Sequence, residues 1–206
     1  MKLAVFDFDS TLMDGETLEF LARAIGIEDK IKQITEKAMC GELDFFESLR
    51  NRVAFLEGLN LDTVNNICES LPIMNGAIET IQELHKRGYK VICFSGGFKN
   101  ATVPFAQKLG LDGEFSNILH SKDGVLTGFV GGEMMFGDSK GQMLKRLQTI
   151  CSVTPENTLV VGDGANDLSM FKYAGMRVAF CAKPILKEKA NIIIEEKDLQ
   201  LIIDKL

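Results

Sequence analysis

The chain has few of the residue types on which zinc, disulfide-rich and thiolate proteins depend. Only two histidines are present, His85 and His120, and they stand far apart without a metal-ligand spacing. A zinc site or a histidine nucleophile therefore has little support. The five cysteines form an odd set without a CxxC pair, which favours buried, reduced thiols. They are Cys40, Cys68, Cys93, Cys151 and Cys181.

Long apolar runs and blocks of one charge are also missing. No run approaches the roughly 18 residues of a membrane span, and the apolar start of the chain is too short for a signal peptide. The 29 acidic and 23 basic residues give a net charge of -6, without a lysine or arginine block suited to a polyphosphate backbone. We therefore expect a cytoplasmic protein whose partners are neither nucleic acid nor membrane. No pattern in the sequence indicates an oligomeric state.

What is present is a repeated arrangement in which a short apolar run stops at a polar residue. These runs are 3–6 before Asp7, 91–94 before Ser95, and 159–161 before Gly162 and Asp163. Continuous apolar runs of this length are typical of buried parallel strands. Because open α/β sheets bind ligands at the carboxyl ends of their strands, we expect the three polar ends to share one site.

The segment between the first two runs has a different character. Residues 15–70 are polar and show helical spacing, with further helical stretches at 29–39, 44–56 and 61–69. From residue 72 onward, strands and helices alternate again. The sequence thus predicts an α/β fold: a doubly wound, mostly parallel, Rossmann-like core of residues 1–13 and 72–206, with residues 14–71 inserted as a helical-bundle cap.

Smaller features refine this organisation. The glycines between residues 115 and 136 predict a strand followed by a peripheral hairpin. Hinges for the cap are expected where the chain crosses between its two parts, at 13–15 and 71–76.

Two acidic clusters follow predicted strands. Asp7 and Asp9 lie two positions apart after the first strand, and Asp163 and Asp167 lie in the glycine-bounded cluster after the third. Alone, the first pair is more typical of an aspartate that caps the following turn, and the second cluster is equally typical of an Asx turn. Together, carboxylates from two strand ends form an oxygen-rich set that suits Mg²⁺, while the absence of an EF-hand loop argues against Ca²⁺.

A phosphate-binding element follows the middle strand. Ser95 and Gly96 can offer a hydroxyl and a backbone amide to phosphate oxygens, with help from the next helix. Lys140, ahead of another predicted helix, can supply a cation. Taken separately, a glycine-rich turn with a serine N-cap and a solvated surface lysine explain these residues as well.

In combination, these segments resemble the four motifs of the haloacid dehalogenase-like phosphatases in order and spacing. Within that superfamily, the motif Ser95-Gly96-Gly97-Phe98 and the positions of Glu16 and Arg52 resemble those of the phosphoserine phosphatases. The motifs are Asp7-Phe8-Asp9-Ser10-Thr11, Ser95-Gly96-Gly97, Lys140 and Gly162-Asp163-Gly164-Ala165-Asn166-Asp167.

The resemblance implies a mechanism with divided roles. Asp7 is expected to be the nucleophile that forms an aspartyl phosphate, and Asp9 the general acid and then base. Asp7, the backbone carbonyl of Asp9 and Asp163 are expected to hold Mg²⁺. Ser95, Gly96, Lys140 and Asn166 are expected to bind the phosphoryl group or support its site. The sequence leaves open whether Asp167 contacts the metal through water or anchors Lys140.

The resemblance also implies the substrate, O-phospho-L-serine, and the last step of L-serine biosynthesis. Glu16 would bind the ammonium of the substrate and Arg52 its carboxylate. Without the resemblance, Glu16 would be a first-turn helix charge and Arg52 a solvated helix residue. Met39 and Phe45 are either pocket wall or bundle core.

Two other functions stay open at this stage. One is a phosphatase or phosphotransferase with the same chemistry that acts on another small phosphomonoester, such as phosphohomoserine, phosphoethanolamine or a sugar phosphate. The other is a catalytically silent phosphate-binding module on the same fold. The intact set of Asp7, Asp9 and Asp163 argues against the silent module.

Overall fold

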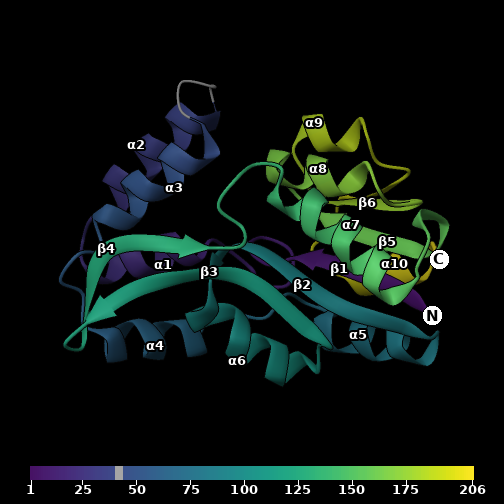
Figure 1. Ribbon diagram of the computed structural model, residues 1–206, viewed down its shortest axis with the longest axis horizontal. Helices are drawn as coiled ribbons and strands as arrows, with labels where there is room; N and C mark the ends of the chain where they lie inside the picture. The colour runs from purple at the N-terminus through teal and green to yellow at the C-terminus, as the bar shows by residue number, and fades with distance from the viewer. Residues whose placement is uncertain (40–43) are drawn as a thin grey trace.

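The computed structural model describes residues 1–39 and 44–206, including all side chains in these ranges except those of residues 32 and 35–39 (Figure 1). Its centre is a seven-stranded sheet with the order β4-β3-β2-β1-β5-β6-β7. Neighbouring strands are parallel except for the antiparallel pair β3–β4 at one edge. The strands are β1 (Lys2–Asp7), β2 (Tyr89–Phe98), β3 (Gly113–Lys122), β4 (Val125–Gly132), β5 (Thr158–Gly162), β6 (Met176–Phe180) and β7 (Ile192–Ile194).

Helices cover both faces of this sheet. Along β1, Ala4 and Phe6 pack on the face that carries α5 and α6, while Leu3 and Val5 pack on the face that carries α7. This two-sided burial is why the strands read as continuous apolar runs. The doubly wound α/β prediction is confirmed. The helices are α5 (Ala77–Lys86), α6 (Lys99–Leu109), α7 (Ser139–Cys151), α8 (Leu168–Phe171), α9 (Pro184–Lys187) and α10 (Gln200–Ile203), with single 3₁₀ turns at Pro155–Asn157 and Ala165–Asp167.

The described residues of the segment between β1 and α5 form four helices. Asp44 caps the third helix by accepting a hydrogen bond from the amide of Glu47 (2.8 Å), and Asn60 caps the fourth through the amides of Asp62 and Thr63. The helical stretches predicted from sequence are confirmed, with boundaries shifted by a few residues. The four helices are α1 (Thr17–Ala24), α2 (Glu28–Met39), α3 (Phe45–Ala54) and α4 (Leu61–Glu69).

The β3–β4 hairpin ties this helical segment to the sheet. The link between α3 and α4 pairs with the hairpin through three backbone hydrogen bonds, Gly58 N to Leu126 O (2.8 Å), Leu126 N to Leu59 O (2.8 Å) and Leu61 N to Gly124 O (2.9 Å). A rigid swing of the whole segment about 13–15 and 71–76 would break these bonds. The two predicted hinges therefore do not fully describe how the helical segment is attached to the core. The sequence did not predict this pairing, because it joins residues more than 60 positions apart and leaves no local signal.

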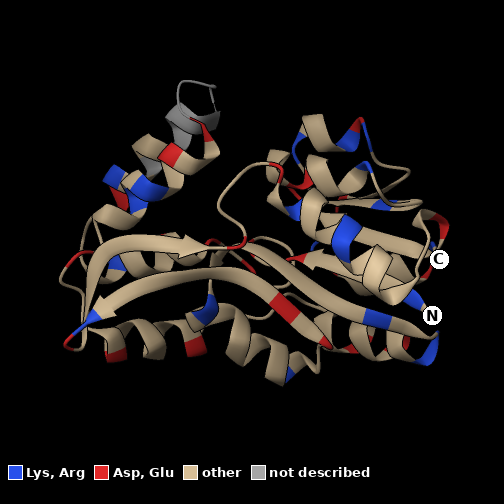
Figure 2. Cartoon of the chain, in the orientation of Figure 1, with Lys and Arg blue, Asp and Glu red and all other residues tan. Residues whose placement is uncertain are grey.

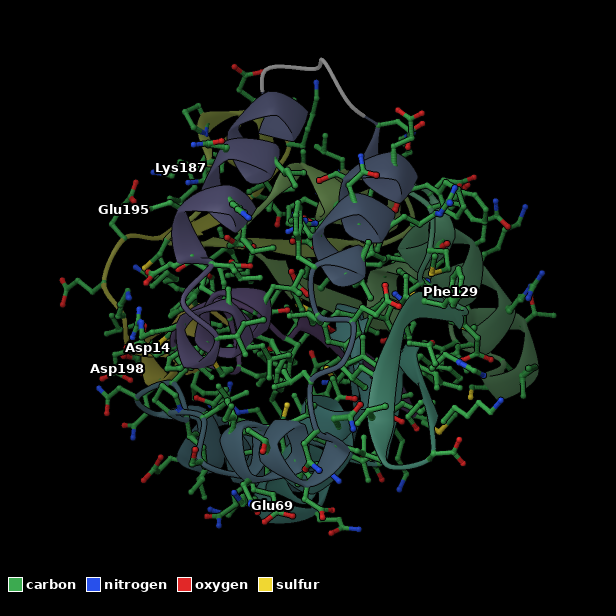
Figure 3. All side chains as sticks on the ribbon, turned by 90° about the vertical axis from the view of Figure 1, so that its left-hand side faces the viewer. Asp14, Glu69, Phe129, Lys187, Glu195 and Asp198 are labelled. Carbon is green, nitrogen blue, oxygen red and sulfur yellow. The ribbon has the colours of Figure 1, made fainter. Side chains whose placement is uncertain are left out.

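The helical segment is also divided by the hairpin. Figures 1 and 3 show α2 and α3 on one side of it, and α4, which ends at Glu69, on the other. α4 is bound to the core helix α6, since Asn100 Nδ2 donates to Asn65 Oδ1 (2.8 Å) and the Lys108 ammonium donates to the carbonyl of Glu69. α3 contacts the core through Phe46, whose ring stacks on that of Phe136 with 5.2 Å between the centroids.

Charges of both signs are interspersed over the elements seen in Figure 2. Within the part of the chain that the structure describes, none of the helices combines the length and the apolar character needed to cross a membrane.

Candidate active site

The site is built where β1 ends, between its neighbours β2 and β5. Asp7 is the last residue of β1 and is buried, and its Oδ1 accepts a hydrogen bond from the amide of Phe8 (2.7 Å). Lys140, in the first turn of α7, places its Nζ 2.6 Å from Asp7 Oδ1 and 2.7 Å from Asp167 Oδ1. Burial alone would lower the pKa of Lys140, but the charges of Asp167 and Asp7 outweigh burial and raise it above its usual range.

Three carboxylates converge beside this lysine. Asp7, Asp163 and Asp167 each offer an oxygen, and the three oxygens lie within 4.8 Å of one another. Burial, followed by the charge of Asp7, raises the pKa of Asp163 to about 8 and that of Asp167 to about 7. A cation would stabilise the ionised form of these crowded, buried carboxylates. Because all the ligands are oxygens, the cluster fits a hard divalent metal.

Asp167 has its own well-defined partners. Its Oδ1 accepts from Lys140, while its Oδ2 accepts from the amides of Asp163 (3.0 Å) and Gly164 (3.2 Å). A side chain at Gly162 would begin 2.3 Å from Asp167 Oδ2, so glycine is required for this approach. Of the two roles that the sequence leaves open, the contact that anchors Lys140 is present in the structure.

Asp9 lies apart from the three-carboxylate cluster. Its Oδ1 accepts two hydrogen bonds from Thr17, one from the amide (2.7 Å) and one from the hydroxyl (2.6 Å). Thr17 is the first residue of α1, whose N-cap, Glu16, makes no capping bond with its side chain, so Asp9 satisfies this helix end. Burial raises the pKa of Asp9 to about 6, against the two bonds from Thr17. A carboxyl with that pKa exchanges protons near neutral pH.

The Ser95–Gly96–Gly97 segment is a bulge inside β2. The sequence predicts a strand over 91–94 and a helix over 99–109. The predicted strand is too short, because β2 continues to Phe98, whereas the predicted helix is confirmed, since α6 begins at Lys99. Glycine adjacent to a bulge lets the strand resume after it. The Ser95 side chain is buried, and its Oγ accepts a hydrogen bond from the amide of Gly97 (2.8 Å).

The remaining predicted residues lie around this centre. Asn166 Nδ2 is 3.4 Å from Asp7 Oδ2, a long hydrogen bond. The hydroxyl of Ser10 donates to Glu16 Oε1 (2.8 Å). Burial, followed by the charge of Asp9, raises the pKa of Glu16 to about 8.

Arg52 is half-buried on α3, and its Nε donates to the carbonyl of Ser48 (3.2 Å). Burial lowers the pKa of Arg52, while the charges of Glu16 and Asp9 act in the opposite direction. The three charged groups therefore share one electrostatic environment, although they belong to different elements of the fold.

Phe45 packs on the bulge of β2. A side chain at Gly96 would begin 2.8 Å from the ring of Phe45, so the absence of a Cβ allows the first residue of α3 to touch the bulge. The side chain of Met39 lies outside the described residues.

Cys68 and Cys93 are buried, and Cys151 and Cys181 are partly buried; all four are free. The predicted reduced thiols are confirmed for these four, while Cys40 lies outside the described residues.

Sequence reasoning missed Thr17 and Asn117. Asn117 is buried on β3 and donates to the carbonyls of Gly96 (3.0 Å) and Met134 (3.1 Å). Neither residue belongs to a recognisable motif, and each acts through a contact that only the folded chain creates.

Comparison with known proteins gives consistent results. Residues 1–175 match the family model of the haloacid dehalogenase-like hydrolases. The chain is 63% identical over 203 residues to a phosphoserine phosphatase of Wolinella succinogenes, covering 98% of each chain.

Two solved structures have the same fold over the whole length. One is a phospho-aspartyl intermediate analogue of phosphoserine phosphatase and the other a substrate-bound phosphoserine phosphatase complex. Each superposes with a TM-score of 0.95 at 49% identity, covering 100% of this chain and 98% of the other.

Proposed function

The chain belongs to the haloacid dehalogenase-like hydrolases and, within them, to the phosphoserine phosphatases, and from this premise we propose that it hydrolyses O-phospho-L-serine to L-serine and phosphate. The observation that carries the proposal is the buried carboxylate of Asp7 at the end of β1, held by Lys140 and facing Asp163 and Asp167. A carboxylate in such a place is suited to nucleophilic attack on a phosphoryl group.

Asp7 carries out the first displacement. Its Oδ1 is engaged by Phe8 and Lys140, whereas Oδ2 has only the long contact to Asn166 among the bonds described, so Oδ2 is the oxygen that attacks phosphorus. A bond forms between Oδ2 and phosphorus, and the bond from phosphorus to the serine oxygen breaks. Asp9 donates a proton to the leaving oxygen.

Water completes the reaction. Asp9, now deprotonated, accepts a proton from a water molecule whose oxygen attacks the phosphorus of the aspartyl phosphate. The acyl phosphate bond breaks, phosphate leaves and Asp7 regains its carboxylate. The pKa of about 6 suits Asp9 to both transfers, because it can hold and release a proton near neutral pH.

The three-carboxylate cluster fits Mg²⁺. Asp7, Asp163 and the backbone carbonyl of Asp9 would hold the ion, with Asp167 beside them. When bound, Mg²⁺ would offset the negative charge of the transferring phosphoryl group. The hydroxyl of Ser95, the amide of Gly96 and the Lys140 ammonium bind phosphoryl oxygens, and the Asn166 amide supports the nucleophile.

Recognition of serine rests on Glu16 and Arg52. Burial and the charge of Asp9 raise the pKa of Glu16 to about 8, so the ammonium of the substrate would favour the ionised form of this carboxyl. Arg52 can bind the substrate carboxylate with two parallel hydrogen bonds. Phe45 packs on Gly96 and would form part of the wall of the substrate pocket, between the serine-binding residues Glu16 and Arg52 and the phosphate.

Phosphate release from a panel of esters tests this function. We expect strong preference for L-phosphoserine over phosphohomoserine, phosphothreonine, phosphoethanolamine and a sugar phosphate with Mg²⁺ present, and a loss of at least about 100-fold in EDTA. Mg²⁺-dependent turnover spread evenly over the panel would keep the chemistry and discard the roles of Glu16 and Arg52. Absence of turnover on every ester would favour a phosphate-binding module.

The variant Arg52→Ala tests the substrate assignment separately. Losing a charge-assisted, bidentate contact should lower kcat/KM for phosphoserine by about 30- to 100-fold, the equivalent of about 2–3 kcal/mol. Hydrolysis of 4-nitrophenyl phosphate, which has no carboxylate, should change less than about threefold. Arg50→Ala is the matched control, because Arg50 is exposed on the same helix and lies over the ring of Phe46. Equal losses on both esters would contradict the carboxylate-binding role.

A further inference from the structure

We propose that Asn117 is a positioning residue that fixes the phosphate-binding bulge and the segment before Lys140 relative to each other. This inference rests on the proposed function, since it concerns how the phosphoryl group is held. Asn117 lies on β3, outside the four motifs, and its side chain contacts two separate segments of the site.

The geometry of β2 creates a need for such a residue. Phe94 pairs with Phe115 and Phe98 pairs with Asn117, so three residues of β2, at 95–97, lie opposite the single residue Ser116. A bulge of this size removes backbone groups from the regular strand ladder. Those groups need other partners, because buried backbone donors and acceptors are rarely left unpaired.

The side chain of Asn117 supplies one of these partners and joins it to a second segment. Its Nδ2 donates to the carbonyls of Gly96 (3.0 Å) and Met134 (3.1 Å), and its Oδ1 accepts from the amide of Met134 (2.9 Å). Both amide hydrogens are therefore used, and the side chain is 0% exposed. A buried amide with all these bonds satisfied has one orientation.

The contact with Gly96 reaches Ser95 through one peptide plane. The carbonyl of Gly96 and the N–H of Gly97 belong to the same planar unit, so fixing the first fixes the second. That N–H donates to Ser95 Oγ at 2.8 Å. Because Oγ accepts this bond, its own hydrogen stays available for a phosphoryl oxygen.

The contact with Met134 reaches Lys140. Met134 is buried and binds Asn117 through both its N–H and its carbonyl. Two residues later, the amide of Phe136 donates to Ser139 Oγ (3.1 Å), at the start of the helix that carries Lys140. One side chain thus sets the spacing between the hydroxyl and the ammonium that bind the phosphoryl group.

Gly132 makes room for this arrangement. It pairs with Asn117 across the hairpin and has a φ of +146°. A Cβ at this position would lie 2.7 Å from Asn117 Cα and 2.8 Å from Asn117 Oδ1. The hairpin therefore serves the site directly, through the residue opposite Asn117.

Asn117→Asp tests the proposal, because it keeps the size of the side chain and the acceptor for Met134 while placing an oxygen against two carbonyls. We expect kcat to fall by about 10- to 100-fold on both phosphoserine and 4-nitrophenyl phosphate. The KM for phosphoserine, governed by Glu16 and Arg52, should change less than about threefold. Asn117→Ser, which adds no charge, carries the same test if the aspartate variant does not fold.

A double-mutant cycle with Ser95→Ala separates positioning from a purely structural role. If Asn117 acts largely through Ser95, its replacement should cost much less in the Ser95→Ala background than in the wild type. Ser116→Ala is the matched control: Ser116 is the adjacent buried residue of β3 but bonds to Thr102 and Glu114 instead. Its kcat should stay within about twofold of wild type.

The outcomes are distinguishable from those that test the proposed function. The ester preference of the wild type tests the proposed function. The ratio of the variant rate to the wild-type rate, on any ester that is hydrolysed, tests the positioning role of Asn117. Binding of inorganic phosphate with Mg²⁺, followed by calorimetry, needs no turnover and should weaken by about tenfold. Unchanged kcat in a folded Asn117 variant, or a full loss that persists in the Ser95→Ala background, would overturn the proposal.

Discussion

Asp7→Asn is expected to lower the rate of phosphate release by at least about 10⁴-fold on every ester. An amide is a poor nucleophile, and the neighbouring carboxylate of Asp9 cannot replace Asp7 because Thr17 binds its Oδ1 away from the cluster. The measurement is single-turnover phosphate release with Mg²⁺, together with a search for an acid-precipitable phosphoenzyme.

The fold should survive this substitution. The carbonyl oxygen of the introduced amide can still accept the bond from Phe8, and removing the charge relieves part of the repulsion that raises the pKa of Asp163 and Asp167. We expect a melting temperature equal to or above that of the wild type in EDTA. Asp204→Asn, at an exposed position near the end of the chain, is the control and should match wild type in both measurements. Turnover retained by Asp7→Asn would refute the nucleophile.

Lys140→Met has the second largest expected effect, on both activity and stability. Turnover should fall by about 10³-fold, because this substitution removes the ammonium that contacts Asp7 and that we propose to bind the transferring phosphoryl oxygens. The free energy of unfolding at pH 8 in EDTA should fall by about 3–5 kcal/mol, since the buried carboxylates lose their cation.

The loss of stability should depend on pH in a defined direction. The folded-state pKa values of Asp163 and Asp167, about 8 and about 7, lie above the ordinary 3.8 of an unfolded chain. The folded state therefore holds these protons more tightly, and the stability they contribute is present at low pH and is lost as the pH rises through 7 to 8. The Lys140 charge lowers both pKa values, so its removal should make this decline steeper.

Urea unfolding at pH 6 and pH 8 in EDTA measures this dependence. The destabilisation of Lys140→Met relative to wild type should be smaller at pH 6 than at pH 8. Lys145→Met, on the exposed side of the same helix, should leave the unfolding free energy unchanged within about 0.5 kcal/mol. A difference between Lys140→Met and wild type that is the same at both pH values would contradict the role of Lys140 as the counter-charge of these carboxylates.

The sequence was most informative where one physical cause governs a continuous stretch. The runs at 3–6, 91–94 and 159–161 are apolar because strands buried on both faces have no solvent side, and all three are strands of the parallel sheet. Their adjacency could be expected too, since the polar residues that follow them point to one shared edge.

The sequence was least informative where partners are distant along the chain. The extension of β2 through Ser95 depends on pairing with β3, and the bonds of the hairpin to Gly58 and Leu61 have no local pattern. The same holds for Asn117 and Thr17, whose residue types are ordinary for a strand and for the start of a helix. The substrate roles of Glu16 and Arg52 remain predictions.

By itself, the sequence determined which reactive side chains this protein has and how buried strands and helices alternate, because both depend on residue type and local period. Only the tertiary structure decided which of these side chains contact one another. It set Lys140 between Asp7 and Asp167, turned Asp9 toward Thr17, and brought Asn117 between the bulge of β2 and the segment before Lys140. These contacts join residues from separate elements, so their geometry exists only once the sheet has formed and burial has made each unpaired polar group costly.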